Sequence, residues 1–403
     1  MSMEYKKFST FIEKVQYGYT AEETSSVEGD AKYLRITDIV PYFVDKERVP
    51  YCTISEKKKE QYLVKENDLL IARTGATTGY NLVIPKGFDN FIFASYLVRY
   101  FYNQNELFPQ YLKHVLKSNQ YYGFVNNYIG GSAQPGMNPA AFGKFEVPYV
   151  EYEKQKRIAK NLSTYDNLIE TNNKRIKVLE RMAENLYKEW FVRFRFPGYE
   201  TAEFENGLPK GWIRKRADEV ISFNPTLPIG NQSSFTIIPM EALSTTSMVM
   251  DSKSFIIQDF ISGRRSQNGD TLFAKITPCL ENGKTGFVMG LPDGEVVGGS
   301  TEFIVLRSKA LTPHYVYCLA RSYYFRQTAI LSMNGADGRQ RVDEDKLKAT
   351  KVVQPARKVL EQFEKIVSPI FEQVHCLTAE NDNLIKQRDL LLPRLMSGKW
   401  EVE

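Results

Sequence analysis

The chain has 403 residues, of which 42% are hydrophobic and 25% are charged, and its formal net charge is +5. This balance is typical of a folded globular protein and excludes a largely disordered chain. At roughly 150 residues per domain, the length predicts two or three domains. The net charge is mild and no segment of the sequence is a basic tail, so any nucleic-acid binding would have to come from a local patch of the surface.

The sequence shows no signal for a membrane span or for export. No apolar run approaches the roughly 18 residues that a spanning helix needs, and Met1–Lys7 lacks the apolar segment of a signal peptide. Scattered cysteines without a CxxC pair favour a reducing compartment over a disulfide framework; they are Cys52, Cys279, Cys318 and Cys376. We therefore expect a cytoplasmic protein without membrane partners. None of the three histidines has metal-ligand spacing, so no metal site is expected.

Each half of the chain begins with short strands and helices. In the first half, Phe91–Arg99 is a predicted strand, and Pro109–Gln120 is a predicted helix that opens with proline. Phe145–Pro148 then reads as a strand that ends at a proline. In the second half the same order is predicted, with a strand at Thr301–Arg307, a helix at Pro313–Arg326 and a strand at Val352–Pro355.

The motifs of the first half recur in the second. The segment Asn67–Arg73 (NDLLIAR) corresponds to Gly269–Lys275 (GDTLFAK), 202 positions later. A Pro-x-Tyr motif at residue 109 recurs at 313, and a Pro-x6-Gln motif at residue 148 recurs at 355. The order is kept while the offset drifts slowly, as expected for a duplicated unit with small loop insertions.

A long helix is predicted after each repeat. Apolar positions step by four and three from Ile158 to Trp190 and again from Phe363 to Leu395, which is typical of a coiled-coil seam. The buried stripe of an ordinary bundle helix is the alternative. Because proline interrupts helices, Pro369 predicts that the second helix is regular only from about residue 370.

An antiparallel arrangement gives every seam position a partner. Positions whose residue numbers sum to 553 then face each other, and Asn172 faces Asn381 at the centre. A buried asparagine lowers stability but fixes register by demanding a hydrogen-bond partner, so we expect these two side chains to pair. The predicted fold is α+β: two similar mixed α/β domains joined by two long antiparallel coiled-coil helices, with a pseudo-twofold internal repeat.

Polar loops occupy matching places in the two halves. Arg73–Gly79 follows a buried strand, and Lys275–Pro278 follows its counterpart. Glycine and hydroxyl residues beside a basic group let a backbone approach phosphates, while arginine and glutamine can read guanine and adenine in the major groove. For any single residue, an ordinary exposed turn stays an alternative. The candidate DNA-binding residues are Arg73, Thr74, Gly75, Thr77, Thr78, Gln134, Arg264, Arg265, Lys275, Thr277, Arg339, Gln340 and Arg341.

Enzyme motifs are weak, and we expect no catalytic residues. Three scattered histidines give no Ser/His/Asp constellation. Glu344 and Lys346 keep open a stand-alone metal-dependent nuclease. A coiled-coil scaffold that touches no DNA is a further alternative.

Along the chain, a mixed α/β domain (a head) and a helix with the Pro-x6-Gln motif alternate twice. This order resembles the specificity (S) subunit of type I restriction-modification enzymes. The resemblance covers essentially the whole chain. Further matches are Gly207–Trp212 (GLPKGW), which opens the second head, and Ala72–Gly75 (ARTG) after its strand. The second head departs from the Arg-x-Gly form, since it has Lys275-Ile-Thr-Pro instead.

The resemblance implies a domain plan. Residues 1–147 and 212–353 would be target recognition domains, each reading one half of a bipartite DNA site. Residues 148–196 and 354–403 would be the conserved helices, with a linker at 197–211. The helices would set the spacer and dock two methyltransferase (M) subunits.

The resemblance also implies partners. The M subunits would bind S-adenosylmethionine and methylate adenine N6, and restriction (R) subunits would join the complex. Besides double-stranded DNA and these subunits, no cofactor is expected in this chain itself.

Overall fold

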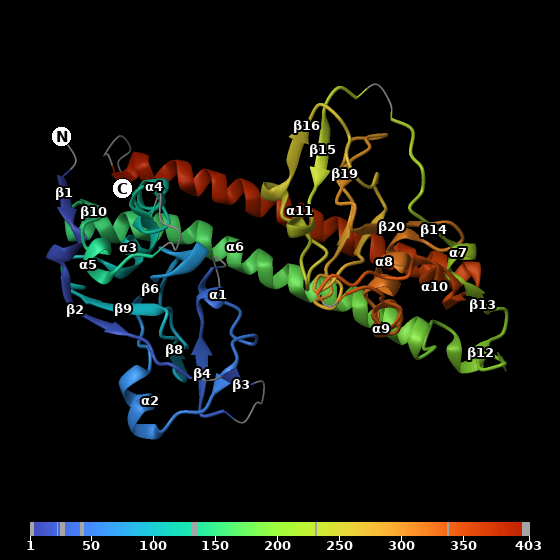
Figure 1. Cartoon of the computed structure of the whole chain (residues 1–403), viewed down its shortest axis with the longest axis horizontal. Coiled ribbons are helices and arrows are strands. Elements are labelled where there is room, and N and C mark those ends of the chain that lie inside the picture. Colours follow the sequence, from blue (N-terminus) through green and yellow to red (C-terminus); the bar gives the residue numbers. More distant parts are fainter. Residues whose placement is uncertain are drawn as a thin grey trace. The chain divides into compact units, whose positions relative to one another are not determined.

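The computed structural model describes residues 4–21, 23–24, 29–40, 44–129, 136–229, 232–336 and 338–396. The chain forms two compact units (Figure 1). Unit 1 comprises residues 1–170 and 382–403, and unit 2 comprises residues 171–381. Both divisions fall inside long helices, so each unit contains its own sheets together with a segment of both helices.

Unit 1 is built on two four-stranded sheets. The first is antiparallel, in the order β2-β9-β6-β7, with β6 buried along its whole length. The second has the order β3-β5-β4-β8, in which β4 and β8 are parallel. The strand bounds are β2 Ile12–Tyr17, β9 Leu97–Tyr102, β6 Leu69–Ala72, β7 Asn81–Val83, β3 Glu23–Thr24, β5 Tyr51–Cys52, β4 Ala31–Leu34 and β8 Phe91–Phe93.

A two-stranded sheet and helices complete unit 1. Strand β1 (Glu4–Lys7) pairs with β10 (Glu146–Tyr149), where Pro148 lies on an edge strand and therefore breaks no inner ladder. The short helices of this unit are α1 Ile36–Ile39, α2 Glu56–Tyr62, α3 Pro109–Val115, α4 Asn119–Ile129 and α5 Pro139–Phe142.

Unit 2 contains a four-stranded antiparallel sheet in the order β14-β20-β17-β18 and a three-stranded sheet in the order β16-β15-β19. Its strands are β11 Phe204–Glu205, β12 Leu208–Pro209, β13 Ile213–Arg216, β14 Ile221–Phe223, β15 Phe235–Ile238, β16 Ile256–Gln258, β17 Thr271–Ala274, β18 Thr285–Phe287, β19 Gly298–Gly299, β20 Phe303–Ser308 and β21 Lys351–Gln354. Its short helices are α7 Ala217–Val220, α8 Pro313–Arg321, α9 Tyr323–Leu331 and α10 Glu344–Ala349.

The two units share connectivity and individual contacts. Strands β6 and β17 occupy the same place in sheets of the same order. The Tyr111 hydroxyl donates to the Pro148 carbonyl at 2.8 Å in unit 1, and the Tyr315 hydroxyl donates to the Val353 carbonyl at 2.8 Å in unit 2. These matches agree with the repeated motif order of the sequence.

The long helices are α6 (Tyr152–Tyr187), which continues in a π-helical turn to Val192, and α11 (Arg357–Met396). Inside unit 2, Asn172 Nδ2 donates to Asn381 Oδ1 at 3.1 Å, and the rings of Trp190 and Phe363 lie 6.0 Å apart. These contacts make the two helix segments antiparallel within this unit, in the register that the seam predicts.

Unit 1 holds its two helix segments together through a buried carboxylate. Asp166 on α6 accepts from Arg388 of α11 at 3.0 Å and from Lys113 of α3 at 2.7 Å. Burial alone would raise the pKa of Asp166, but the Lys113 charge and the groups around it hold it below its ordinary value. Beside it, burial lowers the pKa of His114 to about 4, so this imidazole is neutral near pH 7.

The structure corrects several predicted elements. Phe91–Arg99 is two strands, because residues 94–96 turn the chain from one sheet into the other. The helix predicted from Pro313 to Arg326 is broken at Ser322, whose side chain accepts from the Phe325 amide and starts a new helix. The helix predicted from Pro109 to Gln120 likewise ends at Val115, and α4 begins at Asn119.

Pro369 was wrongly expected to delay the second long helix. Helix α11 runs from Arg357 through this position without a break. The neighbouring side chains Val367, Ile370 and Phe371 are all buried in the core of unit 2. Burial of these side chains offsets the lost hydrogen bond of the proline.

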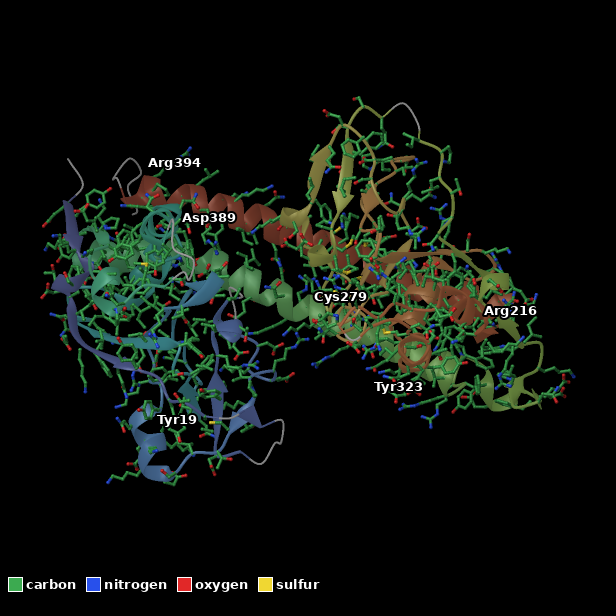
Figure 2. All side chains as sticks on the ribbon, viewed as in Figure 1. Tyr19, Arg216, Cys279, Tyr323, Asp389 and Arg394 are labelled. Carbon is green, nitrogen blue, oxygen red and sulfur yellow. The ribbon has the colours of Figure 1, made fainter. Side chains whose placement is uncertain are left out.

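Among the described residues, no helix is long and apolar enough to cross a membrane. The four cysteines are free thiols. One of them, Cys279, lies in the turn that follows β17 (Figure 2).

Candidate nucleic-acid interface

Arg73 lies where β6 leaves the sheet of unit 1. Its amide donates to the Tyr96 carbonyl at 3.1 Å, and its own carbonyl accepts from the Met137 amide at 2.9 Å. An isolated β-bridge joins Thr74 to Gly136. The Arg73 loop, the turn before β9 and the segment before α5 therefore meet at one edge of the sheet.

Two glycines shape this loop. Gly75 has a φ of +74°, a backbone conformation that favours glycine, whereas an added Cβ would meet no atom within 4 Å. Gly79 has φ of +89°, and an added Cβ would lie 2.8 Å from Val125 Cγ1 of α4. The loop therefore closes tightly onto α4 at its far end.

Two exposed tyrosines flank Arg73, and sequence reasoning missed them. Its guanidinium lies 5.2 Å from the ring centroid of Tyr17, which is 49% exposed, and Tyr96 is 55% exposed. An aromatic ring beside an arginine offers a stacking surface as well as a charge. Their position in the sequence could have indicated them, since each lies at or near the end of a strand of the same sheet.

Lys275 has the same backbone setting in unit 2. Its amide donates to the Glu302 carbonyl at 3.0 Å, and its carbonyl accepts from the Val342 amide at 2.9 Å. A bridge joins Ile276 to Arg341, as one joins Thr74 to Gly136 in unit 1. In each unit, the loop that follows β6 or β17 therefore contacts the segment before a short helix.

The structure brings most of the candidates of unit 2 together. Thr277 and Gln340 exchange two hydrogen bonds, both at 3.1 Å, through the Thr277 amide and hydroxyl. The Arg264 amide donates to the Gly299 carbonyl at 2.8 Å. Gly263 permits this approach, because an added Cβ would lie 1.7 Å from the Gly299 oxygen.

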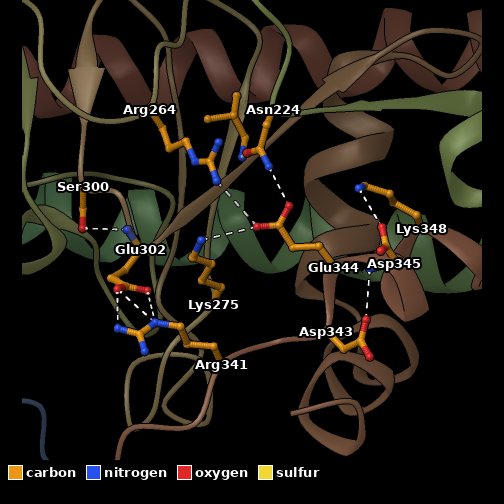
Figure 3. Close-up of polar contacts among 11 residues, drawn as sticks. Asn224, Arg264, Lys275, Ser300, Glu302, Arg341, Asp343, Glu344, Asp345 and Lys348 are labelled. Carbon is orange, nitrogen blue, oxygen red and sulfur yellow. Dashed lines mark hydrogen bonds and ion pairs between the residues drawn. The ribbon is translucent and has the colours of Figure 1, made fainter. Parts of the chain in front are cut away.

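Three of these cations are held by carboxylates (Figure 3). The guanidinium of Arg341 binds both oxygens of Glu302, with its shortest contact at 2.7 Å. This hydrogen-bonded pair holds the pKa of Glu302 below its ordinary value. Glu344 faces Lys275 at 3.3 Å and Arg264 at 3.7 Å.

Other candidates are placed differently. Thr78 is buried, and its hydroxyl donates to the Gly75 carbonyl at 2.7 Å, so it holds the loop instead of facing outward. Arg265 donates to the Leu227 carbonyl at 2.7 Å. Arg339 is exposed. Gln134 lies outside the described residues.

The residues of the nuclease alternative are engaged elsewhere. Glu344 is surrounded by Lys275, Arg264 and the amide of Asn224, while Lys346 pairs with Asp343 at 3.4 Å. Within the described ranges, no three His, Cys, Asp or Glu side chains form a group suited to a metal ion.

Comparison with known proteins gives consistent matches. Residues 25–181 match the family model described as the type I restriction modification DNA specificity domain. The chain is 24% identical over 402 residues to the type I restriction enzyme MjaIX specificity subunit of Methanocaldococcus jannaschii, covering 93% of this chain and 88% of the relative. It is 21% identical over 353 residues to the MjaVIII specificity subunit of the same organism, covering 85% and 81%.

A solved structure is similar over almost the full length. The crystal structure of a type I restriction-modification system S subunit from M. genitalium gives a TM-score of 0.53 at 13% identity, covering 98% of this chain and 96% of that chain. At this identity the likeness shows a shared fold. Together with the sequence matches it confirms the predicted resemblance of the chain to type I restriction-modification specificity subunits.

Proposed function

We propose that this chain is the non-catalytic subunit that selects the DNA sequence in a type I restriction-modification complex. Each unit reads one half of a bipartite target through the loops at the edge of its main sheet. The observation that carries this proposal is the repeated backbone setting of Arg73 and Lys275, each held between the turn before the neighbouring strand and the segment before a short helix. One reading surface is thus built twice with different side chains, which suits two different half-sites.

The loops suit both parts of DNA recognition. Cations such as Lys275 and Arg264 provide phosphate contacts, which give salt-dependent affinity without sequence information. Arg341, Gln340 and Arg73 carry side chains that can form hydrogen bonds to base edges in the major groove. The match of residues 25–181 to the type I restriction modification DNA specificity domain supports DNA as the ligand.

The long helices are proposed to act as a ruler. As an antiparallel coiled coil with a pseudo-twofold repeat, α6 and α11 would set the spacer between the half-sites and dock two M subunits. The paired Asn172 and Asn381 contribute to the register on which such a ruler depends, together with contacts such as that of Trp190 with Phe363. Supporting the proposal is the length of α6, whose 36 residues correspond to about 54 Å at 1.5 Å per residue, more than one duplex turn of about 34 Å.

The chemistry is proposed to belong to the partners. S-adenosylmethionine would bind to the M subunits, which methylate adenine, and R subunits would complete the complex. This chain would bind no cofactor and would supply only the recognition surfaces and the docking helices.

Replacing Arg341 with alanine is expected to weaken recognition of one half-site only. Loss of a bidentate base contact typically costs about 1–3 kcal/mol of discrimination. In the complex with M subunits, methylation mapped by sequencing should therefore relax at the half-site read by unit 2 and stay strict at the other.

Arg357 provides the matched control for this experiment. It is an exposed arginine of α11 that pairs with Glu361, so its change to alanine alters the net charge equally without touching the loops. Relaxation of the other half-site by the Arg341 variant, or an equal effect of both variants, would contradict the assignment of this loop to base reading.

A further inference from the structure

The carboxylate of Glu344 lies among the cations of the unit 2 loops (Figure 3). Its Oε1 is 3.3 Å from Lys275 Nζ and 3.7 Å from a terminal nitrogen of Arg264. Its Oε2 accepts from Asn224 Nδ2 at 2.8 Å. One carboxylate thus contacts side chains from three separate segments of the chain.

This position is built into the fold. Glu344 is the first residue of α10, which Asp343 caps by accepting from the amides of Asp345 and Lys346. Asn224 follows β14 and is held against β20, since its Oδ1 accepts from the amide of Val305 in that strand at 2.9 Å. The carboxylate therefore cannot turn away without losing a hydrogen bond from an anchored donor.

We propose that Glu344 is a specificity-determining residue that restrains Lys275 and Arg264 from binding the phosphates of non-target DNA. This inference rests on the proposed function. The single negative charge of Glu344 offsets one of the two positive charges in the free protein, and the carboxylate also repels an approaching phosphate. At a matching half-site, base contacts from the neighbouring loop residues supply the free energy that exchanges the carboxylate for phosphate.

The energetics of the pairs suit such an exchange. Ion pairs of partly exposed side chains contribute only about 0–1 kcal/mol each, and Lys275, Arg264 and Glu344 are all partly exposed. A restraint of this size cannot block binding. It is large enough to lower the affinity for random DNA several-fold.

In the described part of unit 1, the corresponding place carries no carboxylate. Its equivalent short helix α5 is capped by Asn138 and begins with Pro139, where α10 is capped by Asp343 and begins with Glu344. At the turn before the neighbouring strand, unit 1 has Tyr96 where unit 2 has Glu302. The restraint is therefore a property of unit 2, and removing it should change the behaviour of only one reading surface.

The test is equilibrium binding of the full chain to a random-sequence duplex of about 40 bp, which spans several helical turns, across about 50–200 mM salt. Glu344→Gln keeps the shape of the side chain and its bond to Asn224 but removes the charge. We expect it to bind the random duplex about three- to tenfold more tightly at the lowest salt, with a slope of log affinity against log salt steeper by about one to two.

Asp345→Asn is the matched control, because Asp345 is the next residue of α10, its side chain is 93% exposed, and it pairs with Lys348 at 3.1 Å outside the cluster around Glu344. It makes the same change in net charge and should alter the affinity less than twofold. Adding Lys275→Gln to Glu344→Gln should remove most of the gain. Glu344→Asp keeps the negative charge but moves it away from Lys275 and Arg264, because the side chain is one methylene shorter. It should also tighten binding to the random duplex, and its melting temperature should equal that of the wild-type chain.

The outcomes separate the two proposals. If the wild-type chain binds the duplex and Glu344→Gln gives the same affinity and slope as Asp345→Asn, the restraint is refuted and the DNA-binding function stands. If none of the chains binds the duplex even at the lowest salt, both the restraint and the proposed function are refuted.

Discussion

Replacing Asp166 with alanine is expected to destabilise unit 1 by about 3–5 kcal/mol, the usual cost of removing one partner of a buried ion pair. Asp166 is 2% exposed and Arg388 is 6% exposed, so water cannot replace the missing carboxylate. The loss would remove the buried carboxylate that Arg388 and Lys113 share beside the neutral His114, and Arg388 would keep only the half-exposed Asp389 of its two described carboxylate partners. Urea denaturation of the full chain should show the unit 1 transition at a clearly lower midpoint.

Asp389→Asn is the control for this variant. Asp389 also contacts Arg388, at 2.7 Å, but it is half exposed on α11 (Figure 2), so its loss should cost less than about 1 kcal/mol. The account would be wrong if the two variants were equally stable.

The Asp166 carboxylate also makes the stability of unit 1 depend on pH, and the direction follows from its pKa. The pKa of Asp166 in the folded chain lies below the ordinary value of 3.8, so folding favours its ionised form. Its contribution is complete above the unfolded pKa and is lost as the pH falls through the folded pKa. The loss in free energy of unfolding caused by Asp166→Ala should therefore be complete at pH 7 and become smaller only in strong acid.

Shortening both long helices together is expected to abolish methylation at the original bipartite site. Deleting Asn167–Asn173 from α6 and Glu380–Lys386 from α11 removes facing segments and keeps the seam register on either side. Seven residues correspond to about 10 Å of helix, or about three base pairs at 3.4 Å each. Any bipartite motif that remains in the methylation pattern should have a spacer shorter by about that amount.

A length-neutral change in the same helices provides the control. Replacing Asn172 and Asn381 with leucine removes their hydrogen bond but leaves both helices at full length. Apolar contacts such as that of Trp190 with Phe363 still hold the register, so the spacer should stay unchanged. If the double deletion kept the original spacer with full activity, α6 and α11 would not be the ruler.

Local patterns in the sequence predicted the register of the two long helices inside unit 2. Steps of four and three report directly which face of a helix is buried, so the contact of Asn172 with Asn381 followed from residue numbers alone. The Pro-x6-Gln motif also has a clear physical basis in the first repeat. Gln155 is buried, donates to the carbonyls of Glu106 and Val150, and accepts from the Phe108 amide, so it ties the start of α6 to the start of α3.

The candidate site was only partly predictable, because its contacts join distant segments. The loops of Arg73 and Lys275 could be paired through the repeat. The carboxylates that hold the cations could not, since Glu344 lies 69 positions after Lys275 and Glu302 lies 39 positions before Arg341. No local pattern reports which charges such long-range folding brings together, and the same holds for Tyr17 beside Arg73.

The most direct test of the central claim is the genomic methylation pattern of the host with and without this gene. The account predicts a bipartite motif with methylated adenines that disappears when the gene is deleted and returns when it is restored. An unchanged methylation pattern in the deletion strain, with the M subunits still expressed, would contradict the assignment of this chain as the subunit that selects the DNA sequence.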